Sequence, residues 1–378
     1  MFKIPETDAL QRLSAHGVSV WLDDLSRDLL SGPLDELIEH YSVVGVTTNP
    51  TIFASAMARG DRYNEQLRRL ALDDVPVDNA VFRITTDDVR SACDRLRAVY
   101  DATDRVDGRV CIEVDPGLVH DTEGTISQAR RLWEIVGRDN LLVKVPATRE
   151  GLPAIERLTA EGISVNATLI FSLSRYRQVI DAYLAGLRGA AEQHVNLAGI
   201  TSVASFFVSR VDAAVERRLG DDVSRPASAL RGQVAIANAR CAYRIFEAAL
   251  RDPDWRELHE QGAHAQRPLW ASTGVKDPAL RQGRYAEELI APHTVSTMPL
   301  GTLCAMANHG RIATDTITDN YSDAERTLEA AEEYGIDMEQ VAAELESDGV
   351  RTFQASWAQL RNTVAKGMAR LDDRVGGT

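Results

Sequence analysis

The amino-acid sequence predicts a (β/α)8 barrel, a closed ring of eight parallel strands surrounded by helices. Eight apolar runs of about five residues alternate with amphipathic segments of about ten or more, a pattern typical of a parallel sheet. Eight is also the number of strands that this barrel requires. An open doubly wound sheet is the alternative, but no strand opens into a G-x-G-x-x-G turn and no G-x-x-x-x-G-K-S/T motif occurs. These three observations favour the barrel.

The predicted strands are short and mainly apolar, as strands covered on both faces should be. In chain order they are Val18–Asp23, Val43–Thr47, Arg109–Val114, Leu141–Val145, Gly162–Asn166, Ile200–Ala204, Leu269–Ser272 and Thr294–Thr297. Helical periodicity marks the segments between them, for example Leu25–His40, Glu123–Val136, Gly151–Ala160 and Leu173–Leu187.

Two stretches exceed a minimal barrel. Ile52–Val106 is long enough for several helices, and helical periodicity continues after residue 315 in Ala324–Tyr334, Met338–Leu345 and Phe353–Leu371. No repeat or linker marks a second domain. We therefore expect one domain over residues 1–378, with a barrel core at 16–315, a helical insert at 52–106 and a helical C-terminal extension at 315–372.

The composition is that of a globular protein with a large core: 378 residues, 44% hydrophobic and 26% charged. A formal net charge of −14 repels phosphate backbones, so we expect no nucleic-acid partner. No apolar run reaches the roughly 18–20 residues of a membrane helix, and residues 1–13 lack a signal-peptide pattern. Four scattered cysteines without C-x-x-C spacing are typical of reduced thiols, and we expect a cytoplasmic protein.

Polar residues gather at the predicted strand ends, where a barrel carries its catalytic groups. They are Asp23, Thr47, Thr48, Asn49, Glu113, Lys144, Asn166, Thr168, Ser205 and Ser272. Strand ends are also polar simply because they meet loops. A lysine and two carboxylates at one barrel mouth require more explanation, because buried charges need partners or a task.

Lys144 lies in the run Leu141–Pro146, with apolar residues on both sides. Because a lysine in a buried strand loses hydration, we expect a lowered pKa and a larger fraction of neutral amine. A Schiff-base lysine requires that neutral amine. A structural lysine paired with Glu113 or Asp23 is the open alternative.

Two cues suggest a phosphate site. Arg210, early in the helix after Ser205, could hold a phosphate together with neighbouring hydroxyls and backbone N–H groups. The segment Ala271–Lys276 resembles a phosphate-gripping loop, although ordinary loop chemistry explains both cues equally well. His259 and His264 do not share a helix face and no H-E-x-x-H occurs, so we expect no metal site.

Six segments occur in order between residues 16 and 310 and match one family. They are Val20–Asp23, Gly45–Thr51, Ile112–Asp115, Val143–Gly151, Val165–Ser172 and Ser205–Arg210. Together they resemble transaldolase, and the T-T-N-P signature and the K-V-P-A-T-R-E-G segment are the most specific of them. The insert and the tail resemble the longer bacterial branch of the family.

The resemblance implies four catalytic roles. Lys144 would form a Schiff base with the ketose. Asp23 would take the proton from the donor's C4 hydroxyl as the carbon–carbon bond breaks. Glu113 and Thr168 would hold a water molecule that relays protons during formation of the imine. No cofactor is implied, because a protonated imine is itself the electron sink for the carbanion.

The resemblance also implies a substrate-binding set. Its members are Thr47, Asn49, Asn166, Ser205, Phe207, Arg210, Ser272 and Lys276. The asparagines would bind the dihydroxyacetone hydroxyls, and the last three residues would bind the sugar phosphate. Lys276 stands where many members have Arg, and Ser209 stands where Gly is common. The small aldolase branch carries Tyr and Gln in place of Phe207 and Glu113.

The implied reaction moves a dihydroxyacetone unit from sedoheptulose 7-phosphate to glyceraldehyde 3-phosphate, giving erythrose 4-phosphate and fructose 6-phosphate, in the pentose phosphate pathway. The partners are thus phosphorylated ketoses and aldoses, and we expect a monomer or a homodimer. Phe207 favours transfer over release, because phenylalanine cannot deliver a proton to the intermediate. Three alternatives stay open: a fructose 6-phosphate aldolase, a metal-dependent isomerase, disfavoured by the missing ligand set, and a non-catalytic sugar-phosphate binding protein.

Overall fold

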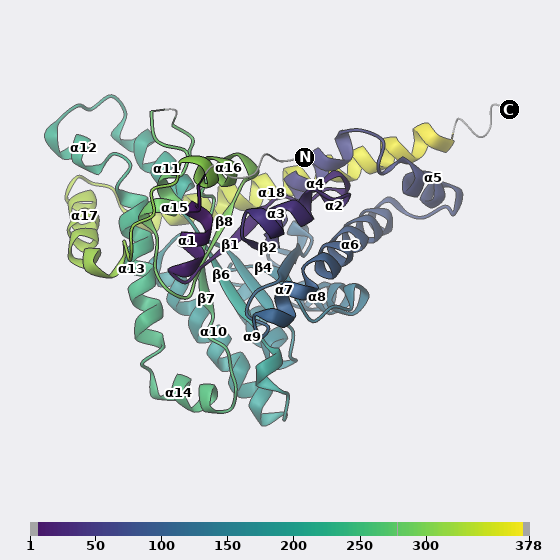
Figure 1. Ribbon diagram of the computed structural model, residues 1–378, viewed down its shortest axis with the longest axis horizontal. Coiled ribbons are helices and arrows are strands. Elements are labelled where there is room, and N and C mark those ends of the chain that lie inside the picture. The colour runs from purple at the N-terminus through teal and green to yellow at the C-terminus, as the bar shows by residue number, and fades with distance from the viewer. Residues whose placement is uncertain (1–6, 278, 373–378) are drawn as a thin grey trace.

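The barrel is closed by eight parallel strands in chain order, with helices around them (Figure 1). A computed structural model describes residues 7–277 and 279–372. The strands are β1 Val18–Asp23, β2 Val43–Thr47, β3 Arg109–Glu113, β4 Leu141–Pro146, β5 Val165–Ile170, β6 Ser202–Phe207, β7 Arg267–Ala271 and β8 Thr294–Met298. The predicted (β/α)8 barrel is confirmed.

Five predicted strands match the structure to within one residue at each end, and three are displaced. The predicted fifth strand began at Gly162, which has φ +83° and lies in a turn before β5. A left-handed backbone favours glycine and ends regular structure. As a result, Asn166 and Thr168 lie within β5, Ser205 lies within β6, and Ser272 follows β7 instead of ending it.

Helices cover the outside of the barrel and extend beyond it. They are α1 Ala9–Ala15, α2 Arg27–Leu30, α3 Pro33–His40, α4 Pro50–Ala58, α5 Asn64–Leu72, α6 Val77–Arg95, α7 Arg97–Ala102, α8 Thr122–Val136, α9 Gly151–Ala160, α10 Leu173–Glu192, α11 Ser209–Leu219, α12 Arg225–Leu230, α13 Val234–Ala249, α14 Pro253–Glu260, α15 Arg284–Glu288, α16 Leu300–His309, α17 Tyr321–Glu333 and α18 Met338–Asp372, with 3-10 turns at Pro116–Leu118, Leu197–Gly199 and Thr318–Asn320. The insert after β2 is helical as predicted, forming α4 to α7. The single helix predicted over Leu25–His40 is wrong. Gly32 at φ +140° and Pro33 at the first position of α3 divide it into two.

Helix α18 is one continuous helix of 35 residues, where separate helical segments were predicted. It packs against α4, α5, α6 and α11 and reaches the end of β5 (yellow in Figure 1). Gly349 interrupts neither the helix nor its contacts. A Cβ at this position would lie 2.9 Å from Cδ2 of Leu169, so the missing side chain lets α18 approach the barrel closely.

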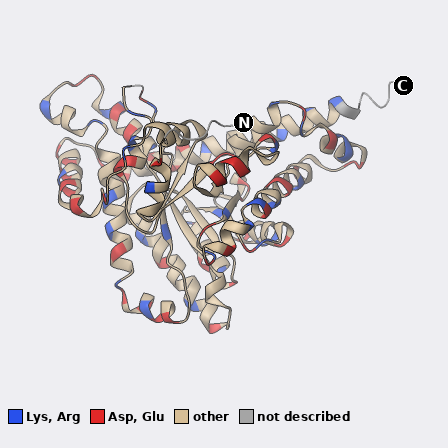
Figure 2. Cartoon of the chain, viewed as in Figure 1, with Lys and Arg blue, Asp and Glu red and all other residues tan. Residues whose placement is uncertain are grey.

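Charged residues of both signs are spread over the outer helices, while the strands are mostly uncharged (Figure 2). Apolar strand residues form the core, where the Trp21 ring occupies the space that a Cβ of Gly45 would need, 2.5 Å away. Within the described ranges, no helix combines the length and apolar character needed to cross a membrane.

Charges are nevertheless buried at the amino end of the barrel. Arg267 at the start of β7 donates to Ser19 and to Asp107, at 2.8 and 3.0 Å. Ser19 in turn donates to Asp107 at 2.8 Å, and the fully buried Arg109 donates to the Asp139 carbonyl at 3.0 Å. The first three bonds tie β7 to β1 and to Asp107 just before β3, and the bond of Arg109 ties β3 to the segment before β4.

Candidate active site

A cavity of about 190 Å³ at the carboxyl end of the barrel brings most of the predicted site residues together. Ten of them line it: Asp23, Thr47, Asn49, Lys144, Thr168, Ser205, Phe207, Arg210, Ser272 and Lys276. Glu113 and Asn166 do not line it but contact residues that do. The lining also contains Ala271 and Gly274, from the segment predicted to resemble a phosphate-gripping loop, and Thr297, Pro299 and Phe353, which were not predicted.

Lys144 lies at the centre of this arrangement. Its register partner on β3 is Glu113, so the two side chains emerge side by side on neighbouring strands. The Lys144 Nζ lies 2.6 Å from Oε1 of Glu113 and donates a hydrogen bond to the Thr48 carbonyl at 2.8 Å. The side chains of the pair are only 7% and 8% exposed. The pair is therefore a dry ion pair.

The direction of the Lys144 pKa differs from the prediction. Burial is the largest single influence and lowers the pKa of Lys144, but the surrounding groups, Glu113 first among them with Cys111 and Asp23, together raise the pKa above its ordinary value. For Glu113 burial acts in the other direction: it raises the pKa of the carboxyl, in spite of the neighbouring ammonium. The sequence shows the buried strand but not the carboxylate beside the lysine, which is why the expected lowering is wrong.

Asp23 ends β1 on the other side of the mouth. Its Oδ1 accepts a hydrogen bond from Thr47 Oγ1 at 2.8 Å, and Thr47 also lies 2.6 Å from the hydroxyl of Thr297. Burial raises the pKa of Asp23, and the charge of Lys144 only partly opposes this. A carboxylate with a raised pKa and a fixed orientation is suited to accept and return a proton.

Glu113 and Thr168 retain unused hydrogen-bonding capacity. Both carboxylate oxygens of Glu113 and the Thr168 hydroxyl are buried, and none makes a directed hydrogen bond to a residue that the structure describes. The short contact with Lys144 occupies Oε1 of Glu113, so Oε2 and the Thr168 hydroxyl are the atoms left without a partner among the described residues. Buried polar atoms without partners are rare and usually have a function.

The T-T-N-P signature has a local structural explanation. Thr47 orients Asp23, and Thr48 donates to the Cys111 carbonyl at 2.8 Å. Asn49 caps α4, with its Oδ1 accepting from the Ile52 N–H at 3.0 Å, and Pro50 occupies the first helical position. The side-chain oxygen of Asn49 is thereby occupied, while its side-chain nitrogen, Nδ2, takes no part in the cap.

Asn166 lies beneath the cavity, fully buried and in register with Lys144. Its Oδ1 accepts from Ser205 Oγ at 2.7 Å, and its Nδ2 lies 3.3 Å from the Cys111 sulfur. These contacts connect β3, β5 and β6 beside the lysine. Ser205 itself reaches the cavity, so the two residues form a layered polar floor.

The opposite wall is basic. Arg210 lies in the first turn of α11, and no ion pair or hydrogen bond joins its guanidinium to any described residue. Its central carbon lies 5.1 Å from the Phe207 ring centroid. Ser272, at φ +56°, lies 2.8 Å from the hydroxyl of Ser209, and Lys276 completes the wall. A cation without a carboxylate partner beside two hydroxyls is suited to bind an anion.

Sequence reasoning missed Thr297 and Phe353. Thr297 near the end of β8 follows the strand-end pattern and could have been found by it. Phe353 comes from α18, about two hundred residues from the lysine in sequence. No local signal could show that this helix lies over the barrel mouth.

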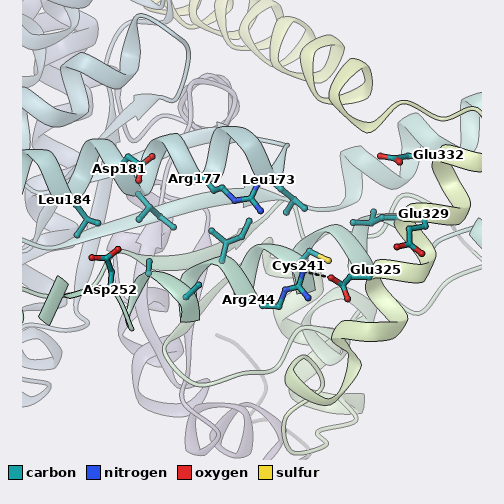
Figure 3. A pocket seen from close by; sticks show the side chains of 15 residues that line it. Leu173, Arg177, Asp181, Leu184, Cys241, Arg244, Asp252, Glu325, Glu329 and Glu332 are labelled. Carbon is teal, nitrogen blue, oxygen red and sulfur yellow. Dashed lines mark ion pairs between the residues drawn. The ribbon is translucent and has the colours of Figure 1, made fainter. Parts of the chain in front are cut away.

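A second cavity has a volume of about 690 Å³, but its acidic lining is unsuited to bind an anion (Figure 3). It lies between α10, α13 and α17, with an apolar floor. Its rim carries five carboxylates, Asp181, Asp252, Glu325, Glu329 and Glu332, against two arginines. Arg244 is already paired with Glu325 at 2.6 Å. We therefore place the chemistry at the smaller cavity, where buried charges meet.

Comparison with known proteins shows which family the chain resembles. The family model described as Transaldolase/Fructose-6-phosphate aldolase matches residues 20–364, beyond the residue at which the motif resemblance ended. "Transaldolase 1" of Streptomyces avermitilis is 55% identical over 357 residues, covering 94% of each chain. "Transaldolase" of Thermobifida fusca is 55% identical over 95% of this chain and 98% of its own. "Transaldolase" of Mycobacterium tuberculosis is 55% identical over 93% of this chain and 95% of its own.

Proposed function

The chain belongs to the transaldolase/fructose-6-phosphate aldolase family, and from that premise we propose how its own residues transfer a dihydroxyacetone unit between sugar phosphates. The overall activity is that of a transferase, as the names of its relatives indicate. The observation that carries the residue assignments is the dry contact of 2.6 Å between Lys144 and Glu113.

Imine formation begins with proton transfer within that pair. The Lys144 ammonium gives a proton to Glu113, whose raised pKa makes it a competent acceptor. The neutral amine attacks C2 of the ketose and forms a carbinolamine. Glu113 returns its proton to the departing hydroxide, so that one water leaves and a protonated imine remains on Lys144. Oε2 of Glu113 and the Thr168 hydroxyl, which have no partner among the described residues, support a water-mediated relay.

Carbon–carbon cleavage depends on Asp23. Its carboxylate takes the C4 hydroxyl proton, the C3–C4 electron pair moves into the imine, and an aldose leaves while an enamine stays on Lys144. The hydrogen bond from Thr47 holds the carboxylate in place. When a second aldehyde arrives, the enamine attacks it and Asp23 returns the proton. Asp23 and Glu113 thus have separate tasks, as two carboxylates in different environments allow.

Arg210, Ser272 and Lys276 would bind the phosphate of both aldoses. The unpaired Arg210 and the hydroxyl of Ser272 supply the donors that a phosphate needs. Asn49, Asn166 and Ser205 would bind the hydroxyls of the dihydroxyacetone unit. The donor would then be sedoheptulose 7-phosphate and the acceptor glyceraldehyde 3-phosphate, as the pentose phosphate pathway requires.

Phe207 favours transfer over simple aldol cleavage. Its ring is 7% exposed, lines the cavity and packs 5.1 Å from the ring of Phe171. It cannot protonate the enamine, and it helps exclude the water that would hydrolyse it. A non-catalytic sugar-phosphate binding protein would not need an amine beside Glu113, and a metal-dependent isomerase does not fit the family.

The domain count, the oligomeric state, the cellular location and the absence of a nucleic-acid partner belong to the same proposal. We propose one domain, a monomer or homodimer, a cytoplasmic location and no nucleic-acid partner. The net charge of −14 supports the last of these.

The test is to separate transfer from release. Incubation with fructose 6-phosphate and erythrose 4-phosphate should give sedoheptulose 7-phosphate, whereas fructose 6-phosphate alone should release free dihydroxyacetone much more slowly. Release at the rate of transfer would show an aldolase. Saturable binding of fructose 6-phosphate without turnover would show a binding protein.

A further inference from the structure

Helix α18 contributes an aromatic side chain to the barrel mouth. Phe353 is 6% exposed and lines the cavity around Lys144. It also lines an adjoining cavity of about 500 Å³ that extends past Asp24 and Arg59. Phe353 therefore lies where the two cavities meet, although it comes from the C-terminal extension and not from a barrel strand or its loop.

The contact that Phe353 makes is with Arg210. The guanidinium carbon lies 6.0 Å from the Phe353 centroid and 5.1 Å from the Phe207 centroid, so both rings contact the cation. A cation over an aromatic face is attracted to it, most strongly where water is excluded. Since no described carboxylate pairs with Arg210, these rings are the contacts that fix its guanidinium.

The neighbouring residues of α18 hold Phe353 in place. Gly349 precedes it by one helical turn, and a Cβ there would lie 2.9 Å from Leu169 and 3.6 Å from Nη1 of Arg210. Ser356 follows it, 8% exposed, with its hydroxyl 2.7 Å from that of Thr51 in α4. One face of α18 thus carries Gly349, which lets the helix approach closely, the ring of Phe353, and Ser356, which anchors the helix to α4.

We propose that Phe353 is a positioning residue for Arg210, and that α18 thereby sets the selectivity of the site for phosphorylated substrates. This inference rests on the proposed role of Arg210 as the phosphate ligand. The ring holds the guanidinium toward the phosphate position and away from Asp23 and Glu113, whose charges attract it. Without the ring, Arg210 would turn toward those carboxylates and phosphate binding would weaken.

The first test is Phe353→Leu, which keeps apolar bulk but removes the aromatic face. KM for fructose 6-phosphate should rise between about 2- and 30-fold, the range expected of one partly desolvated cation–π contact, while KM for unphosphorylated fructose should not change. Phe353→Tyr should restore the wild-type value. Equal losses on both sugars, or no rescue by tyrosine, would overturn the proposal.

Phe82→Leu is the matched control, because Phe82 lies under Arg131, 4.3 Å from its guanidinium carbon, in the outer helix α6. This variant should leave both KM values unchanged. A loss equal to that of Phe353→Leu would show a general effect of removing a buried ring and would overturn the proposal.

A double-mutant cycle decides whether Phe353 acts through Arg210. In an Arg210→Ala background, Phe353→Leu should have no further effect on KM for fructose 6-phosphate. An undiminished effect would overturn the proposal. Gly349→Ala should raise the same KM, because a Cβ 2.9 Å from Leu169 would force α18 to shift and would move Phe353 away from Arg210. No change there would also count against it.

Borohydride trapping distinguishes failure of this inference from failure of the proposed function. All the α18 variants should still trap dihydroxyacetone on Lys144. If the wild-type chain itself does not trap substrate, the proposed function fails. If trapping persists but the phosphate selectivity is unaltered in Phe353→Leu, only the present inference fails.

Discussion

The two ends of the barrel bury charge in opposite ways. At the amino end, Arg267 and Asp107 form a pair at 3.0 Å, and Ser19 bonds to both. At the carboxyl end, Oε2 of Glu113 has no partner among the described residues, and no described carboxylate pairs with Arg210, which lies beside the rings of Phe207 and Phe353. The same strand β1 carries Ser19 at one end and Asp23 at the other, so the difference does not come from the fold.

The difference concerns saturation of hydrogen bonds. A buried charge whose donors and acceptors are occupied holds strands together. Removing one partner leaves the other as an uncompensated charge in the low-dielectric interior. A buried charge with unoccupied atoms keeps them for a substrate or a proton, and its pKa is shifted. We therefore expect the amino end to contribute mainly to stability and the carboxyl end mainly to the proposed chemistry.

Changing the catalytic carboxylates should produce the largest effects on activity. Asp23→Asn should lower kcat on the order of 10²–10⁴-fold, because the C4 hydroxyl loses its base, while the imine still forms. Glu113→Ala should slow imine formation itself. Rapid-quench trapping with borohydride distinguishes the two, and equal, wild-type trapping rates in both variants would contradict the division of labour.

Disrupting the amino end should affect stability and not kinetics. Arg267→Met should cost roughly 3–5 kcal/mol of unfolding free energy, because Asp107 is left without its cation. KM and kcat should not change at a temperature where the variant is folded. Urea denaturation monitored by Trp fluorescence measures the cost, and a loss of kcat without a loss of stability would remove the contrast between the two ends.

Arg210→Ala tests the carboxyl end for its phosphate. KM for phosphorylated substrates should rise on the order of 10–100-fold, since a charge-assisted hydrogen bond contributes about 1.5–3 kcal/mol. Unphosphorylated ketoses should be much less affected. Steady-state kinetics on matched pairs of substrates provide the comparison, and equal losses would assign Arg210 to the fold.

The pH dependence follows from Asp23. Burial raises its pKa above the ordinary 3.8, and it acts as a base only when ionised. The contribution of ionised Asp23 to kcat/KM is therefore present above the raised pKa and is lost as the pH falls through that pKa. The acid limb of the pH profile should lie above the ordinary carboxyl range, and a limb near 3.8 would show that Asp23 is solvated in the working enzyme.

Phe207→Tyr should give the smallest change. A hydroxyl near the enamine can deliver a proton, so release of free dihydroxyacetone should rise relative to transfer to glyceraldehyde 3-phosphate. The ratio of the two products measures this effect. If the ratio stays constant, another feature protects the intermediate.

The sequence predicted what local patterns encode. Short apolar runs with polar ends predicted the barrel and placed Asp23, Glu113 and Lys144 at one mouth, because side chains alternate along a strand and parallel strands end together. It could not give the raised pKa of Lys144, which depends on the distance of 2.6 Å to Glu113. Nor could it place Phe353, since the docking of α18 is decided by tertiary contacts at Leu169 and Thr51.

The central claim is that Lys144 carries the imine, and one measurement tests it most directly. The chain contains only four lysines, Lys3, Lys144, Lys276 and Lys366, so borohydride reduction with fructose 6-phosphate followed by peptide mass mapping gives an unambiguous answer. The expected result is one reduced dihydroxyacetone adduct on the peptide containing Lys144, absent from a folded Lys144→Arg variant. An adduct on Lys276, or no adduct on the active enzyme, would contradict the account.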